Sequence, residues 1–385
     1  MHVLIAPDSF GSTLTAVQAA SAIASGWART APSDDLRSCP VSDGGPGFVD
    51  VLHDALGGRL LAATVTGPAG EPVPATILLV PDRASPPGPP TAYVESAQAC
   101  GLHLVSAGAD PERLSSGGVG QLLLAAVRAG AGTVVVGLGG SATTDGGAGL
   151  LAELGATAQP TDALRGGPSG LTGLQAVDVE PARAATAGVR LLVASDVDNP
   201  LTGLRGAAAV FGPQKGLAAD RLRPVDEVLA GYSALVEGGS FAAARVGIGG
   251  RTAGQPGAGA AGGLGFALLS LGATRVAGIA TVADAVGLSQ ELGSADLVLT
   301  GEGAFDYSSR SGKVVSGVAR LAGDAGVPCV VLAGRVDLGA REMRTMGVES
   351  GYSMSALVGE QASMTDPAGS LAALAERVAR TWSRR

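Results

Sequence analysis

Residues 133–149 read TVVVGLGGSATTDGGAG, and this stretch predicts a strand, a glycine turn and the start of a helix. Every residue of 133–136 is β-branched, which favours a buried strand. Gly137, Gly139 and Gly140 follow at once and allow a tight turn with close approach of a ligand to the backbone. The polar residues 141–145 offer capping oxygens for a helix over residues 146–154. Because free N–H groups at a helix N-terminus attract anions, the stretch predicts an anion site.

Size and composition suit an enzyme of two domains. The chain has 385 residues, of which 46% are hydrophobic and 16% are charged. A net charge of −8 without a basic stripe argues against a nucleic-acid partner. Cys39, Cys100 and Cys329 form no CxxC pair, which fits a reducing cytoplasm. The uncharged residues 252–274 are too rich in glycine for a bilayer span, so we predict no membrane segment.

Strands alternate with helices at both ends of the chain. The expected strands there are 3–6, 36–41, 297–300 and 327–332, and the expected helices are 15–30, 46–56, 313–325, 340–346 and 370–382. Such alternation is typical of an α/β fold with parallel strands. We therefore predict a discontinuous Rossmann-like α/β domain from residues 1–70 and 285–385. Residues 71–284 are predicted to form an inserted second α/β domain.

A strand expected at 60–66 ends the first part of the Rossmann-like domain. The inserted part shows the same pattern with a gap. Strands are expected there at 72–80, 92–95, 133–136 and 189–194, and helices at 114–128, 220–236 and 264–271. Residues 156–187 have a weak pattern with scattered Gly and Pro, and we expect them to be irregular.

The charged groups in the turns are mainly carboxylates. They are Asp8, Asp43, Asp145, Asp196, Asp198, Glu302 and Asp306. Each follows a predicted strand, and open α/β sheets bind ligands at the carboxyl ends of their strands. One Asp in such a place is more often a helix cap, but a whole set in similar settings favours a ligand site. The three histidines lie outside the glycine turns, which argues against a His-activated nucleophile.

Lysine usage points to phosphate or carboxylate binding. Among 26 Lys and Arg residues only Lys215 and Lys313 are lysines, and both lie in glycine turns, GPQKG and SGK. Solvated surface lysines are the ordinary alternative, but a lysine also acts as a compact point charge on phosphate or carboxylate. Carboxylates, lysines and glycine turns together are typical of phosphoryl transfer. In that chemistry acidic residues hold Mg²⁺, lysines and N–H groups stabilise the phosphoryl group, and an Asp accepts the hydroxyl proton.

Two other nucleotide-binding motifs have partial matches in the chain. A Walker A motif is absent, because Gly312-Lys313 is followed by Val314. A dinucleotide fingerprint, Gly137-x-Gly139-x-x-Ala142, leaves a nicotinamide-dependent oxidoreductase as an alternative. The long polar loop before the helix, and the lack of a matching acidic residue about 20 positions on, count against it.

Taken together, the motifs resemble those of the bacterial glycerate kinase family. They occur in the family's order over nearly the whole chain: APDSF at 6–10, SDGG at 42–45, GLGGSATTDGG at 137–147, SDVDNPL at 195–201, FGPQKG at 211–216, GAGAAGG at 257–263, TGEG at 300–303 with Asp306, and GK at 312–313. The resemblance implies a two-domain α/β kinase with its active site in the cleft between the domains. It also implies phosphorylation of D-glycerate from ATP and Mg²⁺, at the 2-hydroxyl in preference to the 3-hydroxyl. A homodimer is left open.

The residues and the resemblance together give a set of candidate site residues. Asp196 and Asp198, in a DxDN turn after a strand, are candidates for the base and for ligands of Mg²⁺. Lys215 and Lys313 are candidates for holding phosphate or carboxylate. Substrate or nucleotide contacts are expected from Asp8, Ser9, Asp43, Gly44, Gly45, Gly139, Gly140, Ser141, Asp145, Asn199, Gly262, Gly263, Glu302 and Asp306.

Five positions depart from the family's usual pattern. Gly11 and Ala304 stand where the family usually has Lys and Arg, and Pro46, Thr144 and Ser308 stand where it has Glu, Asn and Gln. Loss of two cationic groups predicts weaker binding of carboxylate or phosphate. Two alternatives therefore stay open: a kinase with a changed substrate, and a catalytically impaired paralogue that binds a small hydroxy acid or nucleotide.

Overall fold

The computed structural model describes residues 1–11, 13–238, 251–310 and 313–383. The chain divides into two compact units, and the α/β class predicted from the sequence is confirmed in both. Unit 1 comprises Met1–Asp43, Asp50–Gly57 and Ile279–Arg385, and unit 2 comprises Gly44–Val49 and Gly58–Gly278. Among the helices in the described ranges, none has the length and apolar character needed to cross a membrane.

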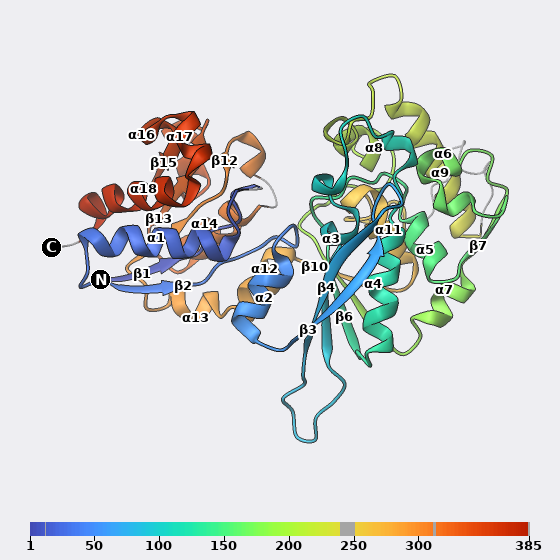
Figure 1. The fold of residues 1–385 in the computed structure, drawn as a ribbon, viewed down its shortest axis with the longest axis horizontal. Helices are drawn as coiled ribbons and strands as arrows, with labels where there is room; N and C mark the ends of the chain where they lie inside the picture. The colour runs from blue at the N-terminus through green and yellow to red at the C-terminus, as the bar shows by residue number, and fades with distance from the viewer. Residues whose placement is uncertain (12, 239–250, 311–312, 384–385) are drawn as a thin grey trace. The chain divides into compact units, whose positions relative to one another are not determined.

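Unit 1 is built on a five-stranded parallel sheet with the order β15-β13-β11-β1-β2 (Figure 1). Its strands are β1 (His2–Ile5), β2 (Asp35–Ser38), β11 (Leu297–Thr300), β13 (Cys329–Ala333) and β15 (Ser350–Ser353). Numbered along the unit, this order is 2-1-3-4-5, a doubly wound arrangement. The strand order reverses between β1 and β11, and ligands bind beyond the carboxyl ends of the strands at such a switch point.

The helices of unit 1 are α1 (Ala16–Thr30), α2 (Phe48–Leu56), α12 (Gly278–Ala285), α13 (Leu288–Leu292), α14 (Val314–Asp324), α15 (Ala340–Thr345), α16 (Met354–Val358), α17 (Glu360–Thr365) and α18 (Pro367–Trp382). Helices α1, α14 and α18 pack against this sheet, and shorter helices complete the unit. A capping box between Thr15 and Gln18 starts α1. Helices α1 and α18 lie side by side (Figure 1), and a Cβ at Gly26 would come within 2.0 Å of the Ala372 carbonyl oxygen. The close approach of the two helices therefore requires glycine at position 26.

Unit 2 contains a mixed six-stranded sheet with the order β10-β9-β6-β5-β4-β3. Its strands are β3 (Arg59–Thr66), β4 (Pro72–Val80), β5 (Thr91–Glu95), β6 (Thr133–Gly137), β9 (Arg190–Ala194) and β10 (Thr274–Val276). The pairs β3–β4 and β4–β5 are antiparallel, and the pairs β5–β6, β6–β9 and β9–β10 are parallel. Its helices are α3 (Ala97–Cys100), α4 (Gly117–Arg128), α5 (Ala148–Glu153), α6 (Gly167–Gly170), α7 (Glu180–Ala185), α8 (Ala207–Phe211), α9 (Leu222–Val236) and α11 (Leu264–Ser270).

Short elements complete both units. Unit 1 has a parallel pair, β12 (Ala304–Phe305) and β14 (Arg335–Val336), with the 3-10 helix η6 (Tyr307–Arg310). Unit 2 has an antiparallel pair, β7 (Thr157–Gln159) and β8 (Ala176–Asp178). It also has the 3-10 helices η1 (Leu102–Leu104), η2 (Pro111–Arg113), η3 (Ala163–Arg165), η4 (Pro213–Lys215) and η5 (Ala260–Gly263).

Two sequence-based assignments differ from the structure. Residues 156–187 were expected to be irregular, which is wrong, because they contain β7, β8, η3, α6 and α7. These elements are three to six residues long, too short for a periodic pattern, and tertiary packing around buried Leu164, Leu171 and Ala182 supports them. Residues 58–70 were placed with the two ends of the chain, whereas β3 pairs with β4 along its whole length and belongs to unit 2.

Candidate active site

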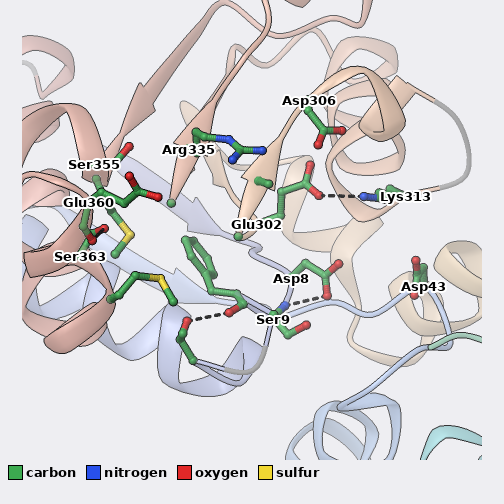
Figure 2. A pocket seen from close by; sticks show the side chains of 18 residues that line it. Asp8, Ser9, Asp43, Glu302, Asp306, Lys313, Arg335, Ser355, Glu360 and Ser363 are labelled. Atoms are coloured by element: carbon green, nitrogen blue, oxygen red, sulfur yellow. Dashed lines mark hydrogen bonds and ion pairs between the residues drawn. The ribbon is translucent and has the colours of Figure 1, made fainter. Parts of the chain in front are cut away.

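The candidate active site is a pocket of about 680 Å³ in unit 1. This volume is within the range of small-molecule sites. Asp8 and Ser9 line it just beyond β1, and Glu302 lines it just beyond β11, so it lies at the switch point of the sheet. The structure brings six of the predicted site residues together in this pocket: Asp8, Ser9, Asp43, Glu302, Asp306 and Lys313 (Figure 2).

The turn after β1 places Asp8 through hydrogen bonds to the neighbouring strand. The backbone N–H of Asp8 donates to the Gly301 carbonyl at 2.8 Å, and the Asp8 carboxylate accepts from the Ser9 N–H at 2.7 Å. Burial raises the pKa of Asp8 well above its usual value, and the nearby Asp43 and Glu302 carboxylates raise it further. A carboxyl group with a raised pKa is suited to proton transfer near neutral pH.

Glu302 carries an oxygen without a partner in the described part of the chain. The residue is 6% exposed, and its Oε2 lies 3.6 Å from the Lys313 Nζ (Figure 2). Its Oε1 is buried and has no hydrogen-bond partner among the residues that the structure describes. Burial raises the pKa of Glu302, while Ser309 and Lys313 act in the opposite direction. A buried polar atom without a partner is costly, so Glu302, which lines the pocket, is a candidate for contact with a ligand.

The remaining lining residues come from segments far apart in the chain. Asp306 follows β12, and its N–H donates to the Ser309 Oγ at 3.2 Å. Sequence reasoning missed Arg335 on β14 and Glu360 on α17, which also line the pocket. Arg335 follows the buried strand β13 and Gly334, the same strand-end setting that singled out the other candidates, so a signal was present.

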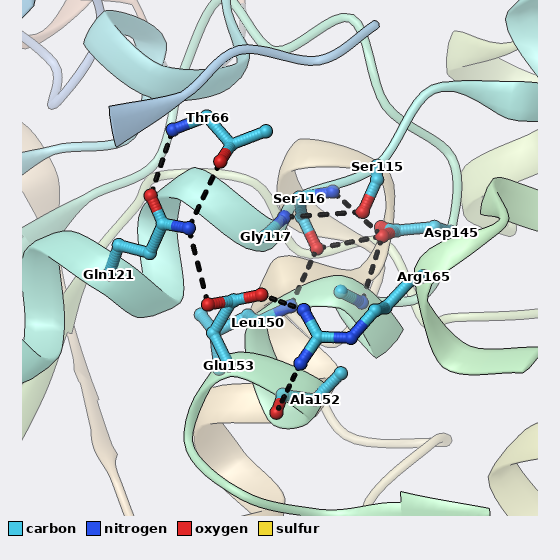
Figure 3. A network of polar contacts seen from close by, with 11 residues as sticks. Thr66, Ser115, Ser116, Gly117, Gln121, Asp145, Leu150, Ala152, Glu153 and Arg165 are labelled. Carbon is cyan, nitrogen blue, oxygen red and sulfur yellow. Dashed lines mark hydrogen bonds and ion pairs between the residues drawn. The ribbon is translucent and has the colours of Figure 1, made fainter. Parts of the chain in front are cut away.

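Asp145 of the opening stretch is bonded entirely within unit 2 (Figure 3). It is fully buried, and its carboxylate accepts from the Ser116 N–H at 2.9 Å and the Ser116 Oγ at 2.7 Å. It also accepts from the N–H groups of Gly147 at 3.0 Å and Gly149 at 3.1 Å. Burial raises the pKa of Asp145, and these hydrogen bonds lower it. Asp145 thus joins the N-terminal ends of α4 and α5.

Lys215 is likewise buried, at 8% exposure, and binds the polar turn that follows β6. Its Nζ donates to the Ser141 Oγ at 2.9 Å and to the Thr143 carbonyl at 2.7 Å. Burial lowers the pKa of Lys215 to about 8. A Cβ at Gly262 would come within 2.8 Å of this Nζ, so the loop before α11 packs directly against the lysine. Contact of Lys215 with a phosphate stays a prediction.

The DxDN turn after β9 has partners in the same unit. An Asp196 carboxylate oxygen accepts from the Gly278 N–H at 3.1 Å, and Asp198 forms an ion pair with Arg275 at 2.8 Å. The Asn199 side-chain amide donates to the Arg205 carbonyl at 2.7 Å. No group of three or more His, Cys, Asp or Glu side chains within the described ranges is arranged to hold a metal ion by itself.

The other predicted glycines pack against protein backbone. Gly44 has a φ of 97°, and a Cβ there would come within 2.8 Å of the Ala194 carbonyl. A Cβ at Gly139 would come within 2.6 Å of Gly45, so these two turns touch each other. Gly140 and Gly263 also have positive φ, at 64° and 99°. Close packing and left-handed backbone explain glycine at these positions without a ligand.

Two of the five departures line the unit 1 pocket, namely Gly11 and Ala304. Thr144 is buried at 1% exposure in unit 2. The Pro46 ring lies 2.9 Å from where a Cβ at Gly140 would be. The side chain of Ser308 and the predicted motif residue Gly312 lie outside the described residues.

Fold and site define an α/β enzyme with a polar pocket at the strand ends of a doubly wound sheet. The chain belongs to the glycerate kinase family, whose sequence model matches residues 3–383. It is similar to a glycerate kinase of Bacillus subtilis strain 168, with 40% identity over 92% of this chain and 90% of that protein. It is also similar to a glycerate 2-kinase of Escherichia coli K12, with 37% identity over 93% of this chain and 92% of that protein.

A solved structure agrees with this assignment. The crystal structure of a glycerate kinase 2 from Salmonella typhimurium LT2 matches with a TM-score of 0.76 and 35% identity. The match covers 99% of this chain and 98% of that chain. The chain is therefore a kinase, and the family resemblance found in the sequence is confirmed. The family decides against the nicotinamide-dependent oxidoreductase that the Gly137 fingerprint had left as an alternative.

Proposed function

We propose that the protein transfers the γ-phosphoryl group of ATP to D-glycerate, at the 2-hydroxyl in preference to the 3-hydroxyl. The observation that carries the proposal is the acidic pocket at the switch point of unit 1, in a chain that belongs to the glycerate kinase family. Similarity to the E. coli glycerate 2-kinase supports the choice of hydroxyl.

The pocket also suits a magnesium ion that is shared with nucleotide. Mg²⁺ is usually held by one or two protein carboxylates, with waters and substrate phosphates as its other ligands. Asp43 and Glu302 are close enough to Asp8 to raise its pKa, and the Glu302 Oε1 has no hydrogen-bond partner among the described residues. Asp43 and Glu302 would therefore be enough to hold the ion, which leaves Asp8 for proton transfer. When bound, Mg²⁺ neutralises charge on the nucleotide phosphates.

The chain's own residues would then act as follows. Asp8 accepts the proton of the attacking hydroxyl, because its raised pKa makes it a stronger base than an ordinary Asp. Lys313 donates from its Nζ to the transferring phosphoryl oxygens while Glu302 holds the ammonium in place. Asp196 and Asp198 are the alternative candidates for the base, and each is tested by its Asn variant.

The test follows ADP release from purified protein with ATP, Mg²⁺ and D-glycerate, against L-glycerate and glycerol as control acceptors. Enolase then identifies the product, since it converts 2-phosphoglycerate directly but acts on 3-phosphoglycerate only after a mutase is added. Release of ADP with D-glycerate and direct conversion by enolase are the expected results. No D-glycerate-dependent ADP release, beside a working control kinase, would falsify the proposal.

A second candidate is a kinase for a different small hydroxy acid. It is favoured by Gly11 and Ala304, which line the pocket without the cationic side chains that the family resemblance implied. A panel of two- to four-carbon hydroxy acids in the same assay separates the candidates. A higher kcat/KM for another acid than for D-glycerate would replace the first proposal by the second.

A further inference from the structure

The unit 1 pocket has more negative than positive groups. Five carboxyl residues line it, namely Asp8, Asp43, Glu302, Asp306 and Glu360, against two cations, Lys313 and Arg335. Both proposed substrates are anions, so they need cationic partners to enter this pocket. Lys313 already faces the Glu302 carboxylate at 3.6 Å. Arg335 is therefore the group to examine for anion binding.

Backbone pairing fixes the place of Arg335. Strand β14 pairs in parallel with β12, and Arg335 lies opposite Ala304 in this register. The Arg335 N–H donates to the Gly303 carbonyl at 3.1 Å, and the Gly334 N–H donates to the Glu302 carbonyl at 3.1 Å. The arginine thus starts from backbone that is tied directly to the Glu302 turn. Ala304, its partner in this register, also lines the pocket.

Contacts within the protein orient the Arg335 side chain through its Nε. The Arg335 Nε forms an ion pair with the Asp337 Oδ2 at 2.7 Å. Within the described part of the chain, the two Nη groups have no hydrogen-bond or ion-pair partner. Figure 2 shows the guanidinium directed toward the side of the pocket that holds Glu302 and Asp306. Because the pair with Asp337 is largely exposed, at 60% and 45%, it is weak and leaves the guanidinium available.

We propose that Arg335 binds an oxyanion of a substrate through its Nη groups. The ligand is either the carboxylate of the hydroxy acid or a phosphate of the nucleotide, since a guanidinium matches both in a two-point geometry. The inference rests on the proposed function, because it takes the unit 1 pocket as the substrate site. It assigns Arg335 to binding and not to proton transfer.

The test compares Arg335→Gln and Arg335→Lys with Arg320→Gln, a matched control that removes an exposed arginine of α14 outside the pocket. Calorimetry measures binding of D-glycerate and of a Mg²⁺-bound non-hydrolysable ATP analogue separately, and kinetics give KM for each substrate. Arg335→Gln should weaken one ligand by about ten- to a hundredfold, and Arg335→Lys should weaken it less. The ligand that weakens identifies the source of the oxyanion. Melting temperatures confirm that the variants are folded.

The outcomes separate this inference from the proposed function. Normal D-glycerate turnover with unchanged affinity for both ligands in Arg335→Gln overturns the role of Arg335 alone. Binding that depends on Arg335 in a protein without D-glycerate turnover overturns the proposed reaction and upholds the inference. Absence of binding of either ligand to the wild-type protein overturns both. Equal weakening in Arg320→Gln shows a general charge effect and overturns the inference.

Discussion

The pocket of unit 1 and the glycine stretch of unit 2 start from the same local pattern, a buried strand followed by glycine and a carboxylate, and end in different environments. In unit 1, Glu302 is 6% exposed and keeps a buried oxygen without a partner among the described residues. In unit 2, Asp145 is fully buried, and four donors of its own chain satisfy its carboxylate. Between these two carboxylates the difference is therefore the supply of donors and not burial.

The largest expected effect is on the chemical step in unit 1. Asp8→Asn removes the proposed base and should lower kcat by about a thousandfold. In the wild type, kcat/KM should fall as the pH falls through the raised pKa of Asp8, because the protonated carboxyl cannot accept a proton. Pre-steady-state and steady-state rates across pH check both points. An Asn variant with wild-type kcat would move the base elsewhere, with Asp196 and Asp198 as the next variants.

The matching change in unit 2 should affect stability first. Asp145→Asn replaces an acceptor of four hydrogen bonds by an amide whose NH₂ faces donors, so the free energy of unfolding should fall by about 3–4 kcal/mol. Denaturant unfolding followed by circular dichroism measures the loss. Asp220→Asn, at an exposed site in the same unit, is the control and should change stability by less than about 0.5 kcal/mol. Equal stability of both variants would break the proposed contrast.

Glu302→Gln in unit 1 should affect activity more than stability, the opposite of Asp145→Asn in unit 2. It should lower kcat/KM by about a hundredfold, because a charge directed at the reaction site is lost. Stability should stay the same or rise, since a neutral amide is cheaper to bury than a carboxylate whose Oε1 has no partner among the described residues. Activity assays beside thermal melts check both, with Asp324→Asn on α14 as an exposed control in the same unit. A strongly destabilised Glu302→Gln would mean that its carboxylate supports the fold.

The smallest expected effect concerns Lys215. Lys215→Met leaves the Thr143 carbonyl and the Ser141 hydroxyl without their donor and should cost about 2 kcal/mol. The folded pKa of about 8 lies below the ordinary value of 10.5, so the unfolded chain binds this proton more strongly between the two values. Wild-type stability relative to the variant should therefore rise as pH increases through this window. Urea melts at several pH values measure the difference, and a constant difference would contradict it.

The sequence sufficed for most of the fold because local patterns were strong. β-Branched runs followed by glycine marked β6 and β11, and apolar spacing marked α1 and α18. Strand order was out of reach, because it depends on pairs such as Val3 with Leu297, which no local pattern connects. The short elements of residues 157–185 were missed for a related reason, since packing rather than periodicity supports them.

The kind of residues in the pocket could be predicted from the sequence, but which residues line it could be predicted only in part. Strand-end position and residue type marked Asp8, Glu302 and Lys313, and the structure places all three in one pocket. The same criteria marked Asp145, because a capping Asp and a ligand-binding Asp have the same neighbours in sequence. Its partner Ser116 lies 29 residues away and became visible only in three dimensions. Glu360 was missed because its helix reaches the pocket through tertiary packing alone.

The pairing of β1 with β11 has a consequence for how the protein is made. The Thr300 hydroxyl donates to the Ala6 carbonyl across 294 residues of sequence, and β1 lies between β2 and β11 in the sheet. A ribosome therefore releases β1 and β2 long before their neighbour exists, while all of unit 2 is synthesised in between. We expect unit 2 to fold first on the nascent chain and the pocket of unit 1 to form only near the end of translation. In a chain that stops before α18, the apolar face of α1 would be exposed to solvent. Such a chain would combine a folded unit 2 with an incomplete unit 1, which quality-control proteases can cleave.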